Sequence, residues 1–337
     1  MQAIANGLLL VLLIKGMILC ITHTQDYYTI DKVQQHLEKM GHATWRLNSD
    51  EFGTQYQFEY IPGKDMYLQQ GAKRIAAADI TGVWYRKLWA LQTPSALDTA
   101  YIPVFNKEYR TSLHIFFDAL QQVPWINKME TDHAVGNNKL LQLQEAQLSG
   151  LTIPRTLLTN NPGQVQAFYT ACQGNMIMKL HGALSRSMDA SGAFFPTTRV
   201  TEQHLLQLDT LAYCPMIFQE YVPKAYELRI AYVDGAFYTG RINAVLDAAG
   251  QTDWRAAHVT LPWEPYLLPD AVAAGLHTFM QRLNLPFGAI DMIRRPDGEY
   301  VFLEVNPQGE WGMLQKYLGY PIAETIAEKL VNKIQHG

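Results

Sequence analysis

Apolar residues recur along this chain at the spacing of strands or helices, and turn-forming residues separate the runs. Residues 17–22 form a compact apolar run that predicts a strand, and residues 29–40 carry apolar side chains at helical spacing before Gly41. Residues 43–47 can return as a second strand. This strand–helix–strand opening predicts a small α/β domain with a parallel sheet.

A similar pattern predicts a hairpin near the C-terminal end. Asp297-Gly298 separates two apolar runs and is suited to a two-residue type I′ turn. Such a turn pairs Pro296 with Glu299, and counting back along both strands places Asp291 directly opposite Glu304. Side chains alternate along a strand, so Asn306 shares the face of Glu304. The other face is expected to be buried and consists of Ile290, Met292, Val301, Leu303 and Val305.

The polar face of this hairpin predicts a metal site. Two neighbouring carboxylates repel each other unless a cation lies between them. Mg²⁺ is commonly held by one or two carboxylates and completed by water and phosphate, so the side chains of Asp291, Glu304 and Asn306 suit it. A solvent-exposed polar strand is the alternative interpretation. The cross-strand register and the single Glu304 within an apolar run favour the metal site.

Composition narrows the class of protein. The chain has 337 residues, of which 48% are apolar and 17% charged, as is typical of a globular protein with a sizeable core and two or three domains. A formal net charge of -4 argues against nucleic-acid binding. The three scattered cysteines predict neither a disulfide framework nor a zinc site, so we expect a cytoplasmic protein.

The N-terminal residues are interpreted as an extension. Residues 7–14 are apolar, but this run is shorter than the roughly 20 residues that span a bilayer, and no basic residue precedes it. We therefore expect no membrane association and treat residues 1–16 as outside the fold, with a signal peptide as the alternative.

Several basic and polar residues are candidates for binding a nucleotide. The chain has no GxGxxG, no GxxxxGK[ST] and no kinase signature, so phosphates would have to be held in another way. Lys179 ends an apolar strand and precedes a segment of small, polar residues, whose backbone N–H groups could bind phosphate while the lysine supplies positive charge. The alternative is an ordinary lysine at the end of a strand before a surface turn. The strand end QEYVP at residues 219–223 could present its backbone N–H and C=O groups to the edge of a purine, and Glu227 could then reach the ribose. The alternative is that QEYVP is only the point where the chain leaves the sheet. Arginine binds phosphate and carboxylate well. Three arginines precede the hairpin, and we expect one of them to be only a surface residue: Arg229, Arg241 and Arg255.

The order of these motifs resembles the ATP-grasp superfamily of carboxylate–amine ligases. The resemblance rests on Lys139 in a helix predicted over residues 132–149, on Lys179, on QEYV with Glu227, on Asp291 and on Glu304-Val305-Asn306-Pro307. Further segments are similar to the microviridin-type (MvdC/MvdD-like) or graspetide synthetases, over essentially residues 17–334: ITHTQDYYTID, RLNSDEF, VWYRKLW, YELRIAYVDG, TDWRAAH and FLEVNPQGEW.

This resemblance implies a mixed α/β fold of the ATP-grasp type, with three subdomains and a nucleotide bound between two sheet-containing lobes. After the extension at residues 1–16, it implies an N-terminal α/β (pre-ATP-grasp) domain at 17–125. A central subdomain at 126–215 and a C-terminal subdomain with the magnesium site at 216–337 would follow.

The resemblance also implies roles for single residues. Lys139 and Lys179 would contact the phosphates of ATP, and Asp291, Glu304 and Asn306 would bind Mg²⁺. Gln219, Glu220, Tyr221 and Val222 would line the adenine edge, with Glu227 at the ribose. Arg241 and Arg255 would lie near the γ-phosphate and the acyl group. After E-x-N-P the family has G-Q-W, whereas this chain has Gly309-Glu310-Trp311.

The activity implied is ATP-dependent ligation within a ribosomal precursor peptide. A side-chain carboxylate of the precursor would become an acyl phosphate, and a hydroxyl or amine of the same peptide would close an ester or amide macrocycle. Residues 182–192 are the candidate lid that keeps water out. The resemblance also implies a homodimer. A RimK-like ligase for an amino acid or peptide is the rival within catalysis, and a non-catalytic peptide-binding scaffold is the rival from another class.

Overall fold

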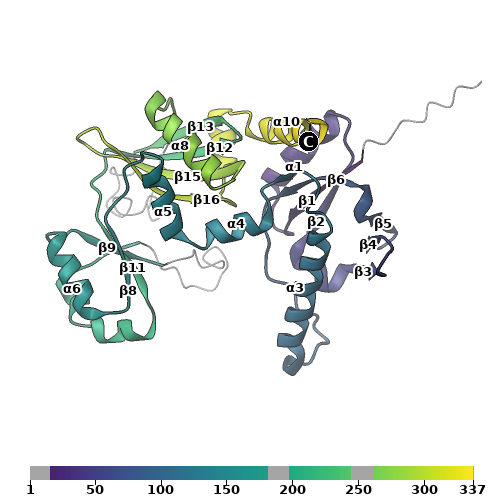
Figure 1. The fold of residues 1–337 in the computed structure, drawn as a ribbon, viewed down its shortest axis with the longest axis horizontal. Coiled ribbons are helices and arrows are strands. Elements are labelled where there is room, and N and C mark those ends of the chain that lie inside the picture. Colours follow the sequence, from purple (N-terminus) through teal and green to yellow (C-terminus); the bar gives the residue numbers. More distant parts are fainter. Residues whose placement is uncertain (1–15, 181–196, 244–261, 337) are drawn as a thin grey trace, which may run out of the picture. The chain divides into compact units, whose positions relative to one another are not determined.

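The computed structural model describes residues 16–180, 197–243 and 262–336, and it divides into two compact units (Figure 1). One unit runs to Ile126 and takes up the chain again at Ala323, and the other spans Asn127–Ile322. The predicted extension up to residue 15, the candidate lid and Arg255 lie outside the described residues.

A parallel sheet forms the centre of the first unit. Its strands are β1 (Met17–Thr22), β2 (Thr44–Asn48), β6 (Ile80–Tyr85) and β7 (Trp125–Ile126), in the order β2-β1-β6-β7. The helix α1 (Tyr28–Lys39) connects β1 to β2 and buries Ile30, Val33 and Leu37. The predicted strand–helix–strand opening and its parallel sheet are therefore confirmed.

The first unit also contains a separate three-stranded sheet, in the order β3-β4-β5, and further helices. Its other elements are α2 (Phe52–Gln55), β3 (Tyr56–Tyr60), β4 (Met66–Gln70), β5 (Lys73–Ala76), α3 (Ile102–Asp118) and α10 (Ile322–His336). A Cβ atom at Gly82 on β6 would lie 2.6 Å from Ile334 of α10, so the glycine lets the helix lie close to the strand. The closing helix thus belongs to the first unit, whereas the predicted boundaries assigned it to the C-terminal subdomain.

Asp26 organises the turn between β1 and α1. It is buried, and its carboxylate accepts hydrogen bonds from the hydroxyls of Thr22 at 2.7 Å and Thr29 at 2.6 Å. Burial alone would raise the pKa of Asp26, but the Arg86 guanidinium at 3.8 Å and the two hydroxyls outweigh it and lower that pKa. The carboxylate is therefore held ionised at the end of the strand.

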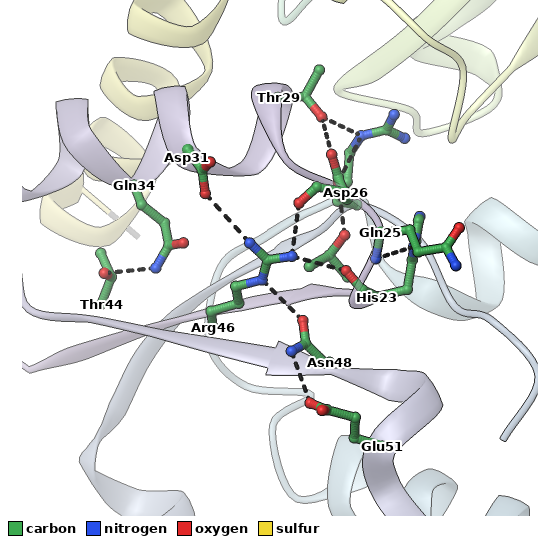
Figure 2. Close-up of polar contacts among 12 residues, drawn as sticks. His23, Gln25, Asp26, Thr29, Asp31, Gln34, Thr44, Arg46, Asn48 and Glu51 are labelled. Carbon is green, nitrogen blue, oxygen red and sulfur yellow. Dashed lines mark hydrogen bonds and ion pairs between the residues drawn. The ribbon is translucent and has the colours of Figure 1, made fainter. Parts of the chain in front are cut away.

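Arg46 on β2 ties the same turn to the sheet (Figure 2). Its Nη2 donates to the carbonyl oxygens of His23 at 2.9 Å and Asp26 at 2.7 Å, and its Nε donates to Asn48 at 2.9 Å. Within the segment ITHTQDYYTID, the side chains of Thr22, Asp26 and Thr29 thus hold one another in place, and Arg46 fixes the backbone of the turn that follows β1.

His23 is expected to make the stability of this unit depend on pH. Its buried ring stacks on Trp89 with the ring centres 3.6 Å apart, and burial lowers its pKa to about 4. An unfolded histidine protonates near its usual value of about 6.5, so the unfolded state binds more protons between these values. Stability should therefore fall as the pH drops through this window, by up to about 1.4 kcal/mol per pH unit.

Urea unfolding of His23→Phe at several pH values tests this expectation. Phenylalanine keeps a flat ring against Trp89 but has no group that titrates, so the variant should lose this part of the slope. His336→Phe, at an exposed position, should keep the wild-type slope. Equal slopes in wild type and His23→Phe would contradict the assignment.

The second unit contains two antiparallel sheets. The smaller has the order β10-β9-β11-β8 and packs with α6; its elements are β8 (Thr156–Thr159), α6 (Pro162–Ala171), β9 (Met176–Lys179), β10 (Thr198–Arg199), α7 (Glu202–Leu205) and β11 (Met216–Glu220). The larger has the order β14-β13-β12-β15-β16; its strands are β12 (Tyr226–Val233), β13 (Ala236–Ile242), β14 (Trp263–Tyr266), β15 (Phe287–Arg294) and β16 (Tyr300–Asn306). No helix of the described residues is both long and apolar enough to cross a membrane.

Helices α5 (Lys139–Leu148) and α8 (Asp270–Arg282) cover one face of the larger sheet. The single helix predicted over residues 132–149 is wrong, because α4 (Met129–Gly136) ends before α5 begins. Asn138 caps α5 by accepting a hydrogen bond from the backbone N–H of Leu141 at 3.0 Å. Lys139 is thus the first residue of α5. The remaining helix, α9 (Gly312–Leu318), follows β16.

The turn between β15 and β16 differs from the predicted one. Arg295 and Glu299 are bridged by a backbone hydrogen bond of 2.8 Å, and the N–H of Gly298 donates to the carbonyl of Arg295 at 3.1 Å. Three residues therefore form the loop, with Gly298 at a φ of 105°. The ring of Pro296 restricts its φ angle to the value required at the first central position of a type I turn. The turn is therefore centred on Pro296 and Asp297, one residue closer to the N-terminus than predicted.

Asp291 nevertheless lies opposite Glu304, as predicted. From Arg294 to Met292, each residue of β15 pairs with a residue of β16 one position earlier than expected. A bulge then leaves Leu303 without a cross-strand partner, and the expected register returns at Asp291. The bulge also changes the buried face. Phe302 enters the core with Ile290 and Met292, whereas Val301 and Leu303, which were predicted there, belong to a separate cluster.

This register predicts unequal costs for two neighbouring truncations. Phe302 is fully buried and packs edge-on against Phe279, so Phe302→Ala should lower the free energy of unfolding by about 3–5 kcal/mol. Leu303 is only partly buried, so Leu303→Ala should cost about 1–2 kcal/mol. Chemical denaturation of both variants measures the difference. The reverse order would support the register without the bulge.

Candidate active site

The face of the larger sheet opposite α5 and α8 carries the predicted metal ligands. On β12, Leu228 and Ile230 point into the core, so the alternate residue Arg229 belongs to the opposite face. Arg229 is paired across the sheet with Asp291 of β15, which is itself paired with Glu304 of β16. Three neighbouring strands therefore bring one cation and two carboxylates together.

Each carboxylate has a cation of its own. Nη1 of Arg229 lies 2.8 Å from both carboxylate oxygens of Asp291, while Nε and Nη2 of Arg229 donate to the carbonyl of Glu310 at 3.2 and 3.0 Å. Lys139 Nζ donates to Glu304 at 2.6 Å. These side chains are partly shielded from water, with exposed fractions from 11% for Arg229 to 25% for Glu304, so their charges interact more strongly than surface charges do.

An apolar patch adjoins these charges. Ile293 lies two residues after Asp291 on β15, and it is paired with Val301 of β16. Val222, from the predicted adenine-binding segment, packs against both, together with Leu303. The residues displaced from the predicted core face thus belong to a small, largely buried apolar cluster beside the carboxylates.

Asn306 lies at the end of β16, where the chain turns sharply. Its Oδ1 accepts a hydrogen bond from the N–H of Gln308 at 2.9 Å, and its carbonyl accepts one from Gly309 at 3.0 Å. A Cβ atom at Gly309 would lie only 2.3 Å from that of Ala289, which is two residues before Asp291. Glycine is therefore required for this turn to lie against the sheet at the site.

The other predicted nucleotide contacts are mostly engaged elsewhere in the unit. Gln219 is buried and donates to Thr156 at 2.8 Å, and Glu220 forms an ion pair with Arg155 at 2.7 Å. The Arg199 guanidinium lies 3.8 Å from the ring centre of Tyr221. Among the predicted adenine contacts, Val222 is the one for which the structure records packing against the face of Asp291 and Glu304.

Lys179 and Glu227 lie on different sheets of the second unit. Lys179 is paired with Ile217 at the end of β9, on the face of the smaller sheet that points away from its α6 core. Glu227 is two residues before Arg229, on the same face of β12, and accepts a hydrogen bond from Lys224 at 2.5 Å.

The structure does not bring Arg241 to the carboxylates. Arg241 is paired with the core residue Leu228, so it lies on the opposite face of the sheet from Asp291. There it forms an ion pair with Glu264, which raises the pKa of Arg241, and it lies 5.1 Å from the ring centre of Tyr226. Arg255, the second predicted catalytic residue, is outside the described residues.

Arg229 is a functional candidate that the sequence does not distinguish from Arg241 and Arg255. The one available signal was its place in the strand before Asp234-Gly235, two residues after Glu227. That position settles which residues share its face of the strand. It does not reveal that β15, with Asp291, is the neighbouring strand.

The side-chain oxygens at this site suit a hard cation whose coordination shell is completed by other ligands. Two carboxylates and one amide oxygen lie on a single sheet face, and the described residues contain no group of three His, Cys, Asp or Glu side chains that could enclose a metal. Mg²⁺ typically keeps water and phosphate ligands in addition to one or two carboxylates, so the residues present fit it.

Comparisons with known proteins agree with this architecture. Residues 17–133 match the MvdD pre-ATP grasp domain. Comparison with curated protein sequences gave no match. The macrocyclase MdnC from Microcystis aeruginosa MRC, solved with its precursor peptide MdnA, is similar with 34% identity and a TM-score of 0.84, over 94% of this chain and 99% of that one.

Two further solved structures are similar over nearly their whole length. The macrocyclase MdnB from Microcystis aeruginosa MRC has 37% identity and a TM-score of 0.80, over 94% of this chain and 99% of that one. A RiPP-associated ATP-grasp ligase from Chryseobacterium gregarium, in complex with ADP and a leader and core peptide, has 30% identity and a TM-score of 0.86, over 94% of this chain and 97% of that one. The mixed α/β fold is thus that of an ATP-grasp enzyme, and the chain belongs to the family of ATP-grasp ligases that act as macrocyclases of ribosomal peptides.

Proposed function

We propose that this protein activates Asp or Glu side chains of a ribosomal precursor peptide with ATP and closes them into ester or amide macrocycles. The observation that carries the proposal is the facing pair Asp291 and Glu304, each held by its own cation, Arg229 and Lys139. The similar enzymes MdnC and the Chryseobacterium gregarium ligase, solved with a precursor peptide and with ADP and peptide, support the choice of substrates.

In the proposed first step, a carboxylate oxygen of the peptide attacks the γ-phosphorus of ATP, and ADP leaves. Two anions approach each other in this step, so positioning and charge neutralisation account for most of the catalysis. Arg229 presents a planar set of donors and Lys139 a point charge on the face where the phosphates would lie. Asp291, Glu304 and Asn306 would hold Mg²⁺, which when bound neutralises part of the phosphate charge.

In the second step, a hydroxyl or amine of the same peptide attacks the acyl carbon. Phosphate leaves, and the nucleophile loses its proton. The apolar patch of Val222, Ile293, Val301 and Leu303 is proposed to contact the adenine ring, with Lys179 and Glu227 near the phosphates and the ribose. The side chains of Gln219, Glu220 and Tyr221 are engaged in other contacts, and the N–H groups of Glu220 and Tyr221 donate to Arg155 and Asn175. These residues would therefore contribute through their backbone carbonyls.

Incubation with ATP, Mg²⁺ and a candidate precursor, followed by mass spectrometry, tests the proposal. We expect ADP release together with the loss of one water from the peptide for each linkage. A RimK-like ligase would instead add the mass of an amino acid or peptide to its acceptor. A binding scaffold would retain the peptide without releasing ADP. ADP release with an unchanged peptide mass would overturn macrocyclisation.

We also propose three features that follow from the resemblance. The second unit would divide near residue 215 into a central subdomain and a C-terminal subdomain, which limited proteolysis can test. The protein would act as a homodimer, which light scattering of the purified chain can measure. Its compartment would be the cytoplasm, which fractionation of producing cells can test.

A further inference from the structure

Gln142 is a buried amide in α5 that bridges two elements of the second unit. Its side chain is 1% exposed. Its Oε1 accepts a hydrogen bond from the backbone N–H of Val305 at 3.0 Å, and its Nε2 donates to the carbonyl of Val135, at the end of α4, at 2.9 Å. Both ends of the amide are therefore used.

The bond to Val305 closes the edge of the larger sheet. In the described part of the chain β16 is an end strand of that sheet, so its N–H groups that point away from β15 have no partner within the ladder. At Phe302 the carbonyl of Thr152 accepts this N–H at 2.9 Å. Val305 is 2% exposed, so water cannot satisfy its N–H, and Gln142 supplies the acceptor instead.

The same helix touches the candidate metal strand twice. Lys139 binds the Glu304 carboxylate, and Gln142, three residues later on the same side of α5, binds the next residue of the strand. Val305 lies between Glu304 and Asn306, two of the three proposed metal ligands. A shift of the strand at Val305 would therefore move both ligands relative to each other and to Lys139.

We infer that Gln142 is a positioning residue of the ligase, which sets the geometry of Glu304 and Asn306 by holding the backbone between them. This inference rests on the proposed function, because it assigns Gln142 to the metal site of that function. It requires that loss of the amide weaken metal binding more than loss of stability alone would.

Gln142→Met tests the inference, since methionine has a similar length and can make neither hydrogen bond. The measurement is Mn²⁺ binding in the presence of a non-hydrolysable ATP analogue, followed by electron paramagnetic resonance, together with the Mg²⁺ dependence of ADP release. We expect the Mn²⁺ dissociation constant and the half-saturating Mg²⁺ concentration each to rise by about 10-fold to 100-fold, as for the loss of partners that orient metal ligands.

Two control variants separate positioning from general damage. Gln144→Met changes an exposed glutamine of the same helix and should leave metal binding at the wild-type value. Leu276→Ala removes a fully buried side chain of α8 and should lower stability without weakening metal binding. The inference is overturned if Gln142→Met binds Mn²⁺ like wild type, or if Leu276→Ala weakens Mn²⁺ binding equally. Wild-type protein that binds no Mn²⁺ with the nucleotide would instead remove the proposed function itself.

Gln142→Glu carries the test if the methionine variant does not fold. Burial raises the pKa of a carboxyl group, and in its protonated form the group can accept from Val305 and donate to Val135, as the amide does. We therefore expect Mn²⁺ binding by this variant to approach the wild-type value at low pH and to fall below it as the pH rises. Mn²⁺ binding that stays well below the wild-type value even at low pH, where the carboxyl group is protonated, overturns the inference.

Discussion

Glu304→Gln should lower ADP release by on the order of 10³-fold, because the variant would hold Mg²⁺ more weakly. The loss of such charge stabilisation at the reacting phosphates typically costs about 3–4 kcal/mol in the transition state. The substitution keeps the size of the side chain but removes the charge that faces Asp291 and binds Lys139. ADP release in the presence of precursor and Mg²⁺ measures the effect, and thermal unfolding verifies that the variant is folded.

Glu299→Gln is the matched control for this experiment. Glu299 lies in the turn of the same hairpin, where it is exposed and contacts Arg295 and Thr152. Glu299→Gln should change ADP release less than about twofold, since surface ion pairs contribute about 0–1 kcal/mol. Turnover by Glu304→Gln within a few fold of wild type would remove Glu304 from the metal site and, with it, the main support for the proposed chemistry.

Arg229→Ala should impair both turnover and stability, whereas Arg241→Ala should affect neither strongly. Arg229 holds both oxygens of Asp291 and the carbonyl of Glu310, so its loss leaves a half-buried carboxylate without its cation. We expect a loss of about 2–3 kcal/mol in the free energy of unfolding, below the 3–5 kcal/mol of fully buried pairs, because Asp291 still reaches water. ADP release should fall on the order of 10²-fold or more.

Arg241 makes the comparison informative, because it is an arginine of the same sheet that pairs with an acidic residue on the opposite face. Its ion pair with Glu264 is exposed, so Arg241→Ala should cost less than about 1 kcal/mol and leave ADP release within a few fold of wild type. Steady-state kinetics and urea unfolding of both variants provide the measurements. A larger loss of turnover in Arg241→Ala than in Arg229→Ala would restore the assignment made from the sequence.

The two Asp-Gly dipeptides show how far local sequence determines a turn. Asp234 and Gly235 both have positive φ angles, 44° and 97°, and form the two-residue turn expected of them. Asp297 and Gly298 follow Pro296, and a three-residue loop forms instead. This difference was readable in the sequence, since proline disfavours the two-residue turn for a local steric reason. The bulge at Leu303 has no such local signal.

The pairing of Asp291 with Glu304 was predicted for a partly wrong reason. The turn is one residue longer than expected and the bulge adds one residue on the other strand, so the two shifts cancel at the site. They do not cancel between the turn and the bulge, which is why Phe302 rather than Leu303 is buried. Packing of Phe302 against Phe279 of α8 stabilises this register, and that contact joins residues far apart in the sequence.

By itself, the sequence determined the local elements and the chemistry that they carry: the parallel opening of the first unit, the hairpin with its carboxylates, and the order of motifs that identifies an ATP-grasp ligase. Short-range periodicity and motif spacing are sufficient for these. Only the tertiary structure decided that Arg229 rather than Arg241 faces Asp291, that Gln142 binds the strand between Glu304 and Asn306, and that the last helix joins the first unit. Each depends on which strands are neighbours and which face a helix covers, and such non-local contacts leave no periodic trace in the chain.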